Sequence, residues 1–159
     1  MTYYTNASLP QYTAESDAAV RIAVENTSIA AALPRTILDI VEETCRKAPQ
    51  QRALGWETSS GVWSYFTYKE YITQIYECAR ALLDCGLQRH KAVCIMGFNS
   101  PEWIIANFGA IFAGGHSAGV YTTNNADVTA FVARDCKAQI FIVDDDEQVY
   151  LFICTYYIF

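Results

Sequence analysis

The sequence predicts an α/β fold with a partial, mostly parallel sheet that is covered by helices on both faces. Three short, mostly apolar runs at 92–98, 117–121 and 139–143 have the length of strands. Helical patterns at 101–113 and 125–136 separate these runs. Strands that are apolar throughout and alternate with helices are typical of parallel pairing with both faces buried. Hydrophobic residues make up 52% of the 159 residues, which is ample for a core.

The beginning of the chain is polar. We expect residues 1–19 to be disordered, and they lack the basic segment and apolar run of a signal peptide. After them, Val20, Ile22 and Val24 alternate with less apolar residues, which predicts a short strand.

The first helix is predicted to begin after Pro34 and to end before Pro49. Thr36 and Asp39 have the spacing of a capping box, with Asp in place of the usual Glu. One face of this helix contains Ile37, Leu38, Val41 and Cys45.

Residues 52–57 and 62–66 are predicted to form a hairpin around Gly61. A second helix follows, because Thr67 and Glu70 have capping-box spacing. Its apolar face contains Ile72, Ile75, Tyr76, Ala79, Leu82 and Leu83. Gly86 is the expected C-cap.

The helix predicted at 101–113 is unusually apolar. Asn99 or Ser100 suits its N-cap, Pro101 its first position and Glu102 its first turn. Only Asn107 is clearly polar inside it, so we expect the helix to be buried on all sides. Three strands and one neighbouring helix cannot supply that cover, which indicates a larger protein around it. In the helix predicted at 125–136, the inward residues are expected to be Val128, Phe131 and Val132.

Two glycine-containing segments resemble phosphate loops. Gly109 and Gly114 have P-loop spacing, but Gly115 and His116 follow instead of Lys and Ser or Thr, and the spacing lies at a helix end. Close helix packing and a glycine C-cap are the favoured interpretation. The hydroxyl-rich segment 58–61 joins two hairpin strands and has no following lysine.

Polar residues follow the carboxyl ends of the predicted parallel strands, where open α/β sheets bind ligands. They could form a small phosphate or metal site, or they could be helix caps and a solvated acidic turn. We favour the second interpretation, since consecutive aspartates cannot all point one way. The residues are Asn99, Ser100, Thr122, Thr123, Asn124, Asp144, Asp145 and Asp146. His90 and His116 lie at strand starts on the opposite edge and are interpreted as structural. The sequence therefore assigns no catalytic, cofactor-binding or metal-ligating residue.

Composition excludes several classes of protein. A net charge of −6 argues against nucleic-acid binding and gives no polybasic attraction to anionic lipid. No apolar run reaches the roughly 18 residues of a membrane-spanning helix. The six cysteines contain no C-x-x-C pair, and we interpret them as reduced thiols of a cytoplasmic protein. Four lie within apolar segments: Cys45, Cys78, Cys94 and Cys136.

Several stretches of the chain form a recognisable series. They are GFNSPEW, GAIFAGG, GVYTTNNADV and VARDCKAQIFIVDD. This series resembles the N-terminal region of bubblegum-type acyl-CoA synthetases, which belong to the adenylate-forming, AMP-binding superfamily. PRTILDIVEETCRKAP, TYKEY and ECARALLDCGL resemble the segments that precede it there. The resemblance covers residues 20–148 and implies an incomplete N-terminal subdomain of the adenylate-forming fold.

The resemblance implies a long-chain fatty acid–CoA ligase. In that family a fatty acid carboxylate attacks the α-phosphate of ATP, and the thiol of coenzyme A then displaces AMP. ATP, Mg²⁺ and coenzyme A are the implied ligands. The family's Ser/Thr/Gly-rich loop ending in Pro-Lys-Gly, its aromatic-Gly-x-Thr-Glu segment, its ribose-binding aspartate and its C-terminal lysine have no counterpart here. No catalytic residue can be carried over, and we expect these 159 residues to be a truncated fragment, inactive alone.

Residues 149–159, VYLFICTYYIF, depart from the family pattern and are interpreted as a non-homologous hydrophobic tail. An alternative to ligase activity is a non-catalytic short isoform that binds a partner protein through uncovered apolar surface. A free-standing flavodoxin-like domain is a third and weaker interpretation. The protein is expected to be cytoplasmic, and a lipid substrate is compatible with peripheral membrane contact.

Overall fold

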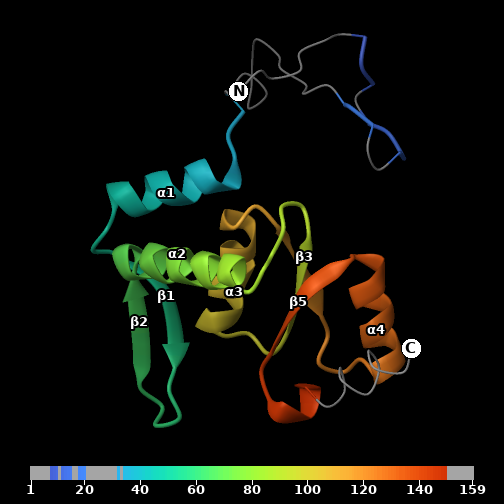
Figure 1. Cartoon of the computed structure of the whole chain (residues 1–159). Coiled ribbons are helices and arrows are strands. Elements are labelled where there is room, and N and C mark those ends of the chain that lie inside the picture. Colours follow the sequence, from blue (N-terminus) through green and yellow to red (C-terminus); the bar gives the residue numbers. More distant parts are fainter. Residues whose placement is uncertain (1–7, 11, 16–17, 21–31, 33, 150–159) are drawn as a thin grey trace. The chain divides into compact units, whose positions relative to one another are not determined.

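The computed structural model describes most of the chain from residue 34 onward (Figure 1). The described residues are 8–10, 12–15, 18–20, 32 and 34–149. Residues 1–39 and 40–159 form two compact units, and all the elements below belong to the second, apart from the first turn of α1. The strand predicted around Ile22, and the predicted tail 149–159 apart from Val149, lie outside the described residues.

The chain alternates between helices and strands in the predicted order. The elements are α1 (Ile37–Lys47), β1 (Arg52–Glu57), β2 (Trp63–Thr67), α2 (Tyr68–Asp84), β3 (Ala92–Met96), α3 (Pro101–Phe112), β4 (His116–Val120), α4 (Ala126–Asp135) and β5 (Ala138–Val143). Each of the helices and strands expected from residue 36 to residue 143 is present, with its ends displaced by at most two residues.

Short side-chain hydrogen bonds fix where the helices begin. Thr36 N–H donates to Asp39 Oδ2 at 2.9 Å, and Asp39 N–H donates to Thr36 Oγ1 at 3.1 Å. Thr67 and Glu70 make the same reciprocal pair at α2, at 2.8 and 3.2 Å. Both predicted capping boxes are therefore confirmed. The N–H and hydroxyl of Thr67 donate to Glu70, which lowers the pKa of that carboxyl below its ordinary value.

The parallel sheet has three strands in the order β4–β3–β5, so β3 is central and each outer strand has one neighbour. All five residues of β3 are buried. Val93 and Ile95 face a core cluster shared with α2 and α3, whereas Cys94 and Met96 face a cluster that includes Ala133 of α4. Helices therefore cover both faces of this sheet, which confirms the predicted fold class (Figure 1). β1 and β2 form a separate antiparallel hairpin.

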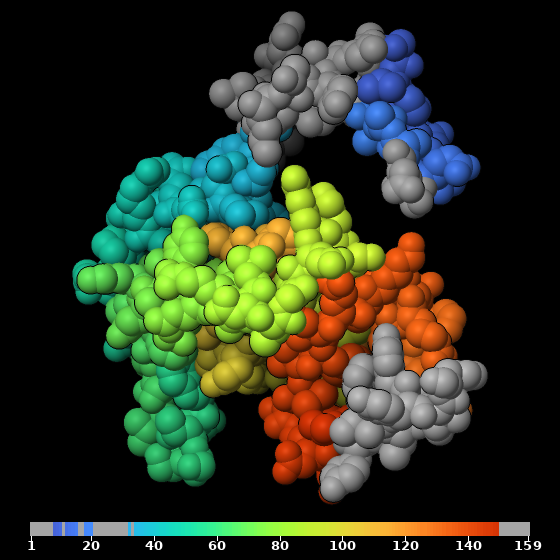
Figure 2. Space-filling model, in the orientation of Figure 1, coloured from blue at the N-terminus to red at the C-terminus, as the bar shows by residue number. Residues whose placement is uncertain are grey.

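α2 and α3 pack closely because a glycine lies at their contact. A Cβ added to Gly109 would lie 2.6 Å from Cys78 Sγ and 2.9 Å from Cys78 Cβ, both on α2. Two edge-to-face aromatic pairs, Tyr71 with Phe108 and Tyr76 with Phe112, flank this contact. In the space-filling view α2 covers much of α3 (Figure 2). The packing role predicted for Gly109 is confirmed.

Both of these helices end in glycines with left-handed backbone. Gly86 has φ +90° and Gly114 has φ +83°. Leu87 N–H donates to Leu82 O, and Gly115 N–H donates to Ala110 O, as in a Schellman motif. The C-cap residue of α2 is Cys85, so Gly86, the residue predicted as the cap, lies one position beyond the observed cap. These turns lead directly into β3 and β4.

Two burial expectations need correction. Phe131 and Val128 of α4 are 63% and 44% exposed, so the prediction that they point inward is wrong. The buried residues of α4 are instead the smaller Thr129, Ala130 and Ala133, and Ala133 packs in the cluster that contains Cys94 and Met96 of β3. α3 is not enclosed on all sides among the described residues. Its buried residues are small, and its larger apolar side chains are half-buried.

The Thr129 hydroxyl is buried without a hydrogen-bond partner among the described residues. Thr129→Val keeps the shape of the side chain and removes a desolvated hydroxyl, so we expect it to raise the free energy of unfolding by about 1 kcal/mol. Chemical denaturation of the chain measures this change. Thr129→Ser is the matched control and should lower stability, because it keeps the hydroxyl and loses a buried methyl group. A destabilised valine variant would mean that the hydroxyl has a partner.

Gly109→Ala should lower the free energy of unfolding by about 1–3 kcal/mol, because the new methyl group overlaps Cys78. The loss should occur although alanine has the higher helix propensity. Adding Cys78→Ala, which removes the nearest atom, should recover part of the loss in a double-mutant cycle. If the changes in the free energy of unfolding caused by the two substitutions were strictly additive, this would contradict the close contact between Gly109 and Cys78.

Candidate functional site

The strand order creates a crevice at the carboxyl ends of β3 and β4. The connection after β3 leads to α3, which packs on one face of the sheet. The connection after the adjacent β4 leads to α4, which packs on the other face. Neighbouring connections that diverge in this way define a topological switch point, the usual ligand-binding position of open α/β sheets.

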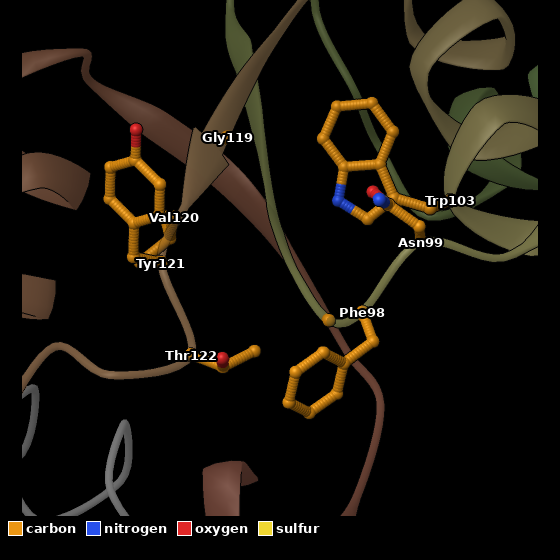
Figure 3. Close-up of a pocket in the computed structure, with 8 residues that line it drawn as sticks. Phe98, Asn99, Trp103, Gly119, Val120, Tyr121 and Thr122 are labelled. Atoms are coloured by element: carbon orange, nitrogen blue, oxygen red, sulfur yellow. The ribbon is translucent and has the colours of Figure 1, made fainter.

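The crevice has a volume of about 480 Å³ and is lined by Gly97, Phe98, Asn99, Trp103, Gly119, Val120, Tyr121 and Thr122. Trp103 and Tyr121 lie on opposite sides of it (Figure 3). A Cβ added to Gly119 would lie 3.5 Å from Trp103 Cζ2, in ordinary van der Waals contact, so it would take up space beside the indole. This volume falls within the range of roughly 300–1,000 Å³ that is typical of small-molecule pockets.

Aromatic residues dominate the rim. Phe98 is 73% exposed and Tyr121 is 79% exposed, which is unusual for side chains of their size. The side chains of Asn99 and Thr122 supply polar groups. None of the eight lining residues is acidic or basic, so the crevice suits an apolar or planar ligand better than a highly charged one.

Only some of the polar residues that follow the predicted strands line the crevice. Asn99 and Thr122 line the crevice. Ser100 instead caps α3, because its Oγ accepts a hydrogen bond of 3.2 Å from Trp103 N–H. Thr123 and Asn124 are not among the lining residues. The cap of α4 is Asn125, whose Oδ1 accepts from Val128 N–H at 3.0 Å.

The aspartates after β5 form a local turn. Asp145 Oδ1 accepts a hydrogen bond of 2.8 Å from Gln148 N–H, and Gln148 Oε1 accepts one of 3.0 Å from Asp144 N–H. Within residues 34–149 and the short described stretches before them, no three His, Cys, Asp or Glu side chains are grouped to hold a metal ion. Ser100 and Asp145 each accept a hydrogen bond from a backbone N–H three residues later, as expected for helix caps and turn residues.

The remaining motifs serve the fold. Thr58 Oγ1 donates to Val62 O at 2.9 Å and contacts Ser60 Oγ at 2.9 Å, so these hydroxyls stabilise the hairpin turn. His116 begins β4 and pairs with Ala92 at the start of β3, at the edge of the sheet opposite the crevice. Among the described residues, no helix is long and apolar enough to cross a membrane.

Sequence reasoning missed the aromatic lining of the crevice. The sequence pattern assigns Trp103 to the apolar surface of its helix and Phe98 to the strand before it. Tyr121 directly follows β4. Its position at the carboxyl end of a parallel strand is the sequence signal that could have identified it as a residue of the crevice. The neighbouring polar residues Asn99 and Thr122 are identified in the sequence by the same signal, because they also follow parallel strands.

Residues 41–152 match the protein family described as AMP-binding enzyme. Among curated proteins, the long-chain-fatty-acid–CoA ligase ACSBG2 of Xenopus laevis is 39% identical over 138 residues, which cover 87% of this chain and 18% of the relative. ACSBG1 of Bos taurus is 33% identical over 138 residues, covering 87% and 19%. This chain thus spans less than a fifth of the length of these relatives, and the resemblance to bubblegum-type synthetases is confirmed.

Solved structures share the fold. The anthranilate CoA ligase AuaEII, in complex with anthranoyl-AMP, superposes with a TM-score of 0.66 at 23% identity, over 77% of this chain and 23% of that protein. The N-terminal domain of FACL13 from Mycobacterium tuberculosis gives a TM-score of 0.64 at 20% identity, over 72% and 28%. The fold predicted for this chain is therefore confirmed. Together with the family match over residues 41–152, this establishes that the chain belongs to the AMP-binding enzyme family.

Proposed function

We propose that residues 41–148 contribute the N-terminal part of a long-chain fatty acid–CoA ligase, an enzyme that joins a fatty acid to coenzyme A at the expense of ATP. The observation that carries this proposal is the 33–39% identity to ligases of that name across most of the chain. The α/β fold with its switch-point crevice supports it, since such crevices bind ligands.

Within that function, the crevice contacts the apolar part of the substrate. Its aromatic residues Phe98, Trp103 and Tyr121 offer flat apolar surface, and Asn99 and Thr122 offer polar groups for orientation. A fatty acyl chain matches this lining because it gains from leaving water and needs no counter-charge.

The lining of this crevice does not suit the phosphates of ATP or a magnesium ion. The crevice lacks a basic side chain, and glycines Gly109 and Gly114 serve helix packing and a helix end. No acidic group is placed among the lining residues to hold Mg²⁺. We assign no step of adenylation to side chains of this chain, and we propose that the 159 residues are inactive alone.

A non-catalytic interaction module is the second candidate function. Large apolar side chains are exposed on the hairpin and on α4, among them Val62, Trp63 and Phe131. Exposed apolar surface marks interfaces. If this function is correct, the chain should co-elute with a full-length ligase relative in gel filtration; separate elution would count against it. Peripheral membrane contact is proposed because the substrate is a lipid. Co-sedimentation of the chain with phospholipid vesicles would support this contact, and its absence would count against it.

The purified 159-residue chain should form no acyl-CoA from ATP, coenzyme A and oleate. The physical reason is that the crevice offers no charged side chain to hold the triphosphate. Release of AMP together with oleoyl-CoA measures the reaction, and full-length Xenopus laevis ACSBG2 serves as the reference enzyme. Product formation by the chain alone would contradict this proposal.

A chimera tests the ligase function directly. Residues 41–148 replace the matching segment of the Xenopus laevis relative, and the chimera is expected to retain ATP-dependent oleoyl-CoA formation. In the chimera, Tyr121→Ala should raise the KM for oleate roughly tenfold, because the acyl chain would lose its contact with the aromatic ring, and a loss of about 1.4 kcal/mol is tenfold in affinity. The matched control is Phe131→Ala, an exposed aromatic residue on α4 that does not line the crevice.

The outcomes of the chimera experiment are separable. A chimera with native circular dichroism but without ligase activity would overturn the proposed function of this segment. An active chimera in which Tyr121→Ala and Phe131→Ala behave alike would keep the ligase function and remove the crevice from substrate binding.

A further inference from the structure

Two cysteines far apart in the sequence have their sulfur atoms in contact. Cys94 lies in the centre of β3 and is fully buried, and Cys136 is the C-cap residue of α4. Their Sγ atoms are 3.6 Å apart, although 42 positions separate them along the chain. Both are free thiols.

The fold places these thiols together through strand register. β5 pairs with β3 from Ala138 opposite Ala92, and Cys136 precedes that strand by two residues. Cys94 points toward the face of the sheet that α4 covers, where the small Ala133 lets the helix approach. Cys136 Sγ also contacts Ala133 O at 3.7 Å, which directs the thiol inward.

The other described cysteines differ from this pair. Cys45 is buried in α1, Cys78 is half-buried in α2, and Cys85 is exposed at the end of α2. Among the cysteines that the structure describes, only Cys94 and Cys136 have a recorded sulfur–sulfur contact. A disulfide has an S–S length of about 2.0 Å, so rotation of the side chains must shorten the separation by about 1.6 Å.

We propose that Cys94 and Cys136 form a reversible disulfide when the protein meets hydrogen peroxide. The partly exposed Cys136 reacts first. Its thiol gives up a proton, the thiolate sulfur attacks one peroxide oxygen, the O–O bond breaks, and the departing hydroxide takes up that proton to give water. Cys94 sulfur then attacks the sulfenic sulfur. The S–O bond breaks, the leaving hydroxide takes the Cys94 proton, and the second water forms. Two thiols are oxidised and one peroxide is reduced to two waters.

Burial divides the roles of the two thiols. Desolvation, and then the hydrogen bond with Cys136, raises the pKa of the Cys94 thiol well above its ordinary value. Cys94 therefore stays protonated near neutral pH and does not react with peroxide from solution, since the thiolate is the reactive form. Contact with an oxidised Cys136 is what brings it into reaction.

The disulfide would join the central strand to the end of α4. It closes a loop that contains α3, β4 and α4, so the unfolded chain loses conformational freedom. α4 otherwise rests on the sheet through small side chains, and the bond would hold it there covalently.

Peptide mapping of the full 159-residue chain tests the proposal. The chain is treated with hydrogen peroxide, the reaction is stopped with catalase, free thiols are blocked with N-ethylmaleimide, and the protein is digested with trypsin without reduction. Cleavage after Lys91, Arg134 and Lys137 puts the two cysteines on separate peptides, 92–134 and 135–137. We expect these peptides to be disulfide-linked, and dithiothreitol to separate them.

Three variants and one denatured control make the result specific. Cys94→Ala and Cys136→Ser should abolish the linked peptide, whereas Cys85→Ser, at the exposed cysteine, should leave it unchanged. In urea the link should form at least about tenfold more slowly, because the folded chain holds the sulfurs in contact. Equal rates with and without urea, or oxidation of wild type that leaves 92–134 and 135–137 unlinked, would overturn the proposal.

Thermal unfolding and in-cell trapping give independent readouts. Oxidised wild type should melt roughly 5–10 °C higher than the reduced protein, and Cys136→Ser should show no such increase. Peroxide treatment of cells that express the chain, followed by acid quenching and alkylation, reports the same link without purification. Absence of both the shift and the trapped link would likewise reject the disulfide.

Discussion

Burial of β3 on both faces is the constraint on which the rest of the described fold depends. A strand with five buried residues has no solvent side, so it needs a hydrogen-bonded neighbour at each edge and a helix layer above and below. β4 and β5 satisfy the edges, and α2 with α3 on one face and α4 on the other satisfy the layers. The crevice follows from the same constraint, because consecutive connections must leave the sheet in opposite directions.

Local chemistry made most of the elements predictable. Capping pairs such as Thr67 with Glu70, and glycine ends such as Gly86, specify a helix start or stop within a few residues of sequence. The orientation of α4 was not predictable in this way. Its large apolar residues include Phe131, which is exposed, whereas the small Ala133 determines how closely the helix approaches the sheet. Which face of a weakly amphipathic helix is buried depends on the shape of its partner.

The candidate site was only partly predictable for a related reason. Its polar members could be placed after parallel strands, since that position is fixed by alternation along the chain. The pairing of Trp103 with Tyr121 across the crevice depends on β4 lying beside β3, with β5 on the far side. Strand order is a long-range property, and sequence periodicity does not contain it. Family resemblance supplied the fold but could not supply this lining, because no residue role was transferable to it.

The strand order also determines how this sheet can grow. β4 and β5 each use one edge to pair with β3, and within residues 34–149 the other edge of each has no strand beside it. Such an edge carries a row of N–H and C=O groups that can form a ladder with any extended segment. The sheet can therefore be extended from both sides by further strands. The same openness makes an isolated sheet of this kind prone to edge-to-edge association, which a neighbouring strand, a covering loop or a well-placed charge would suppress.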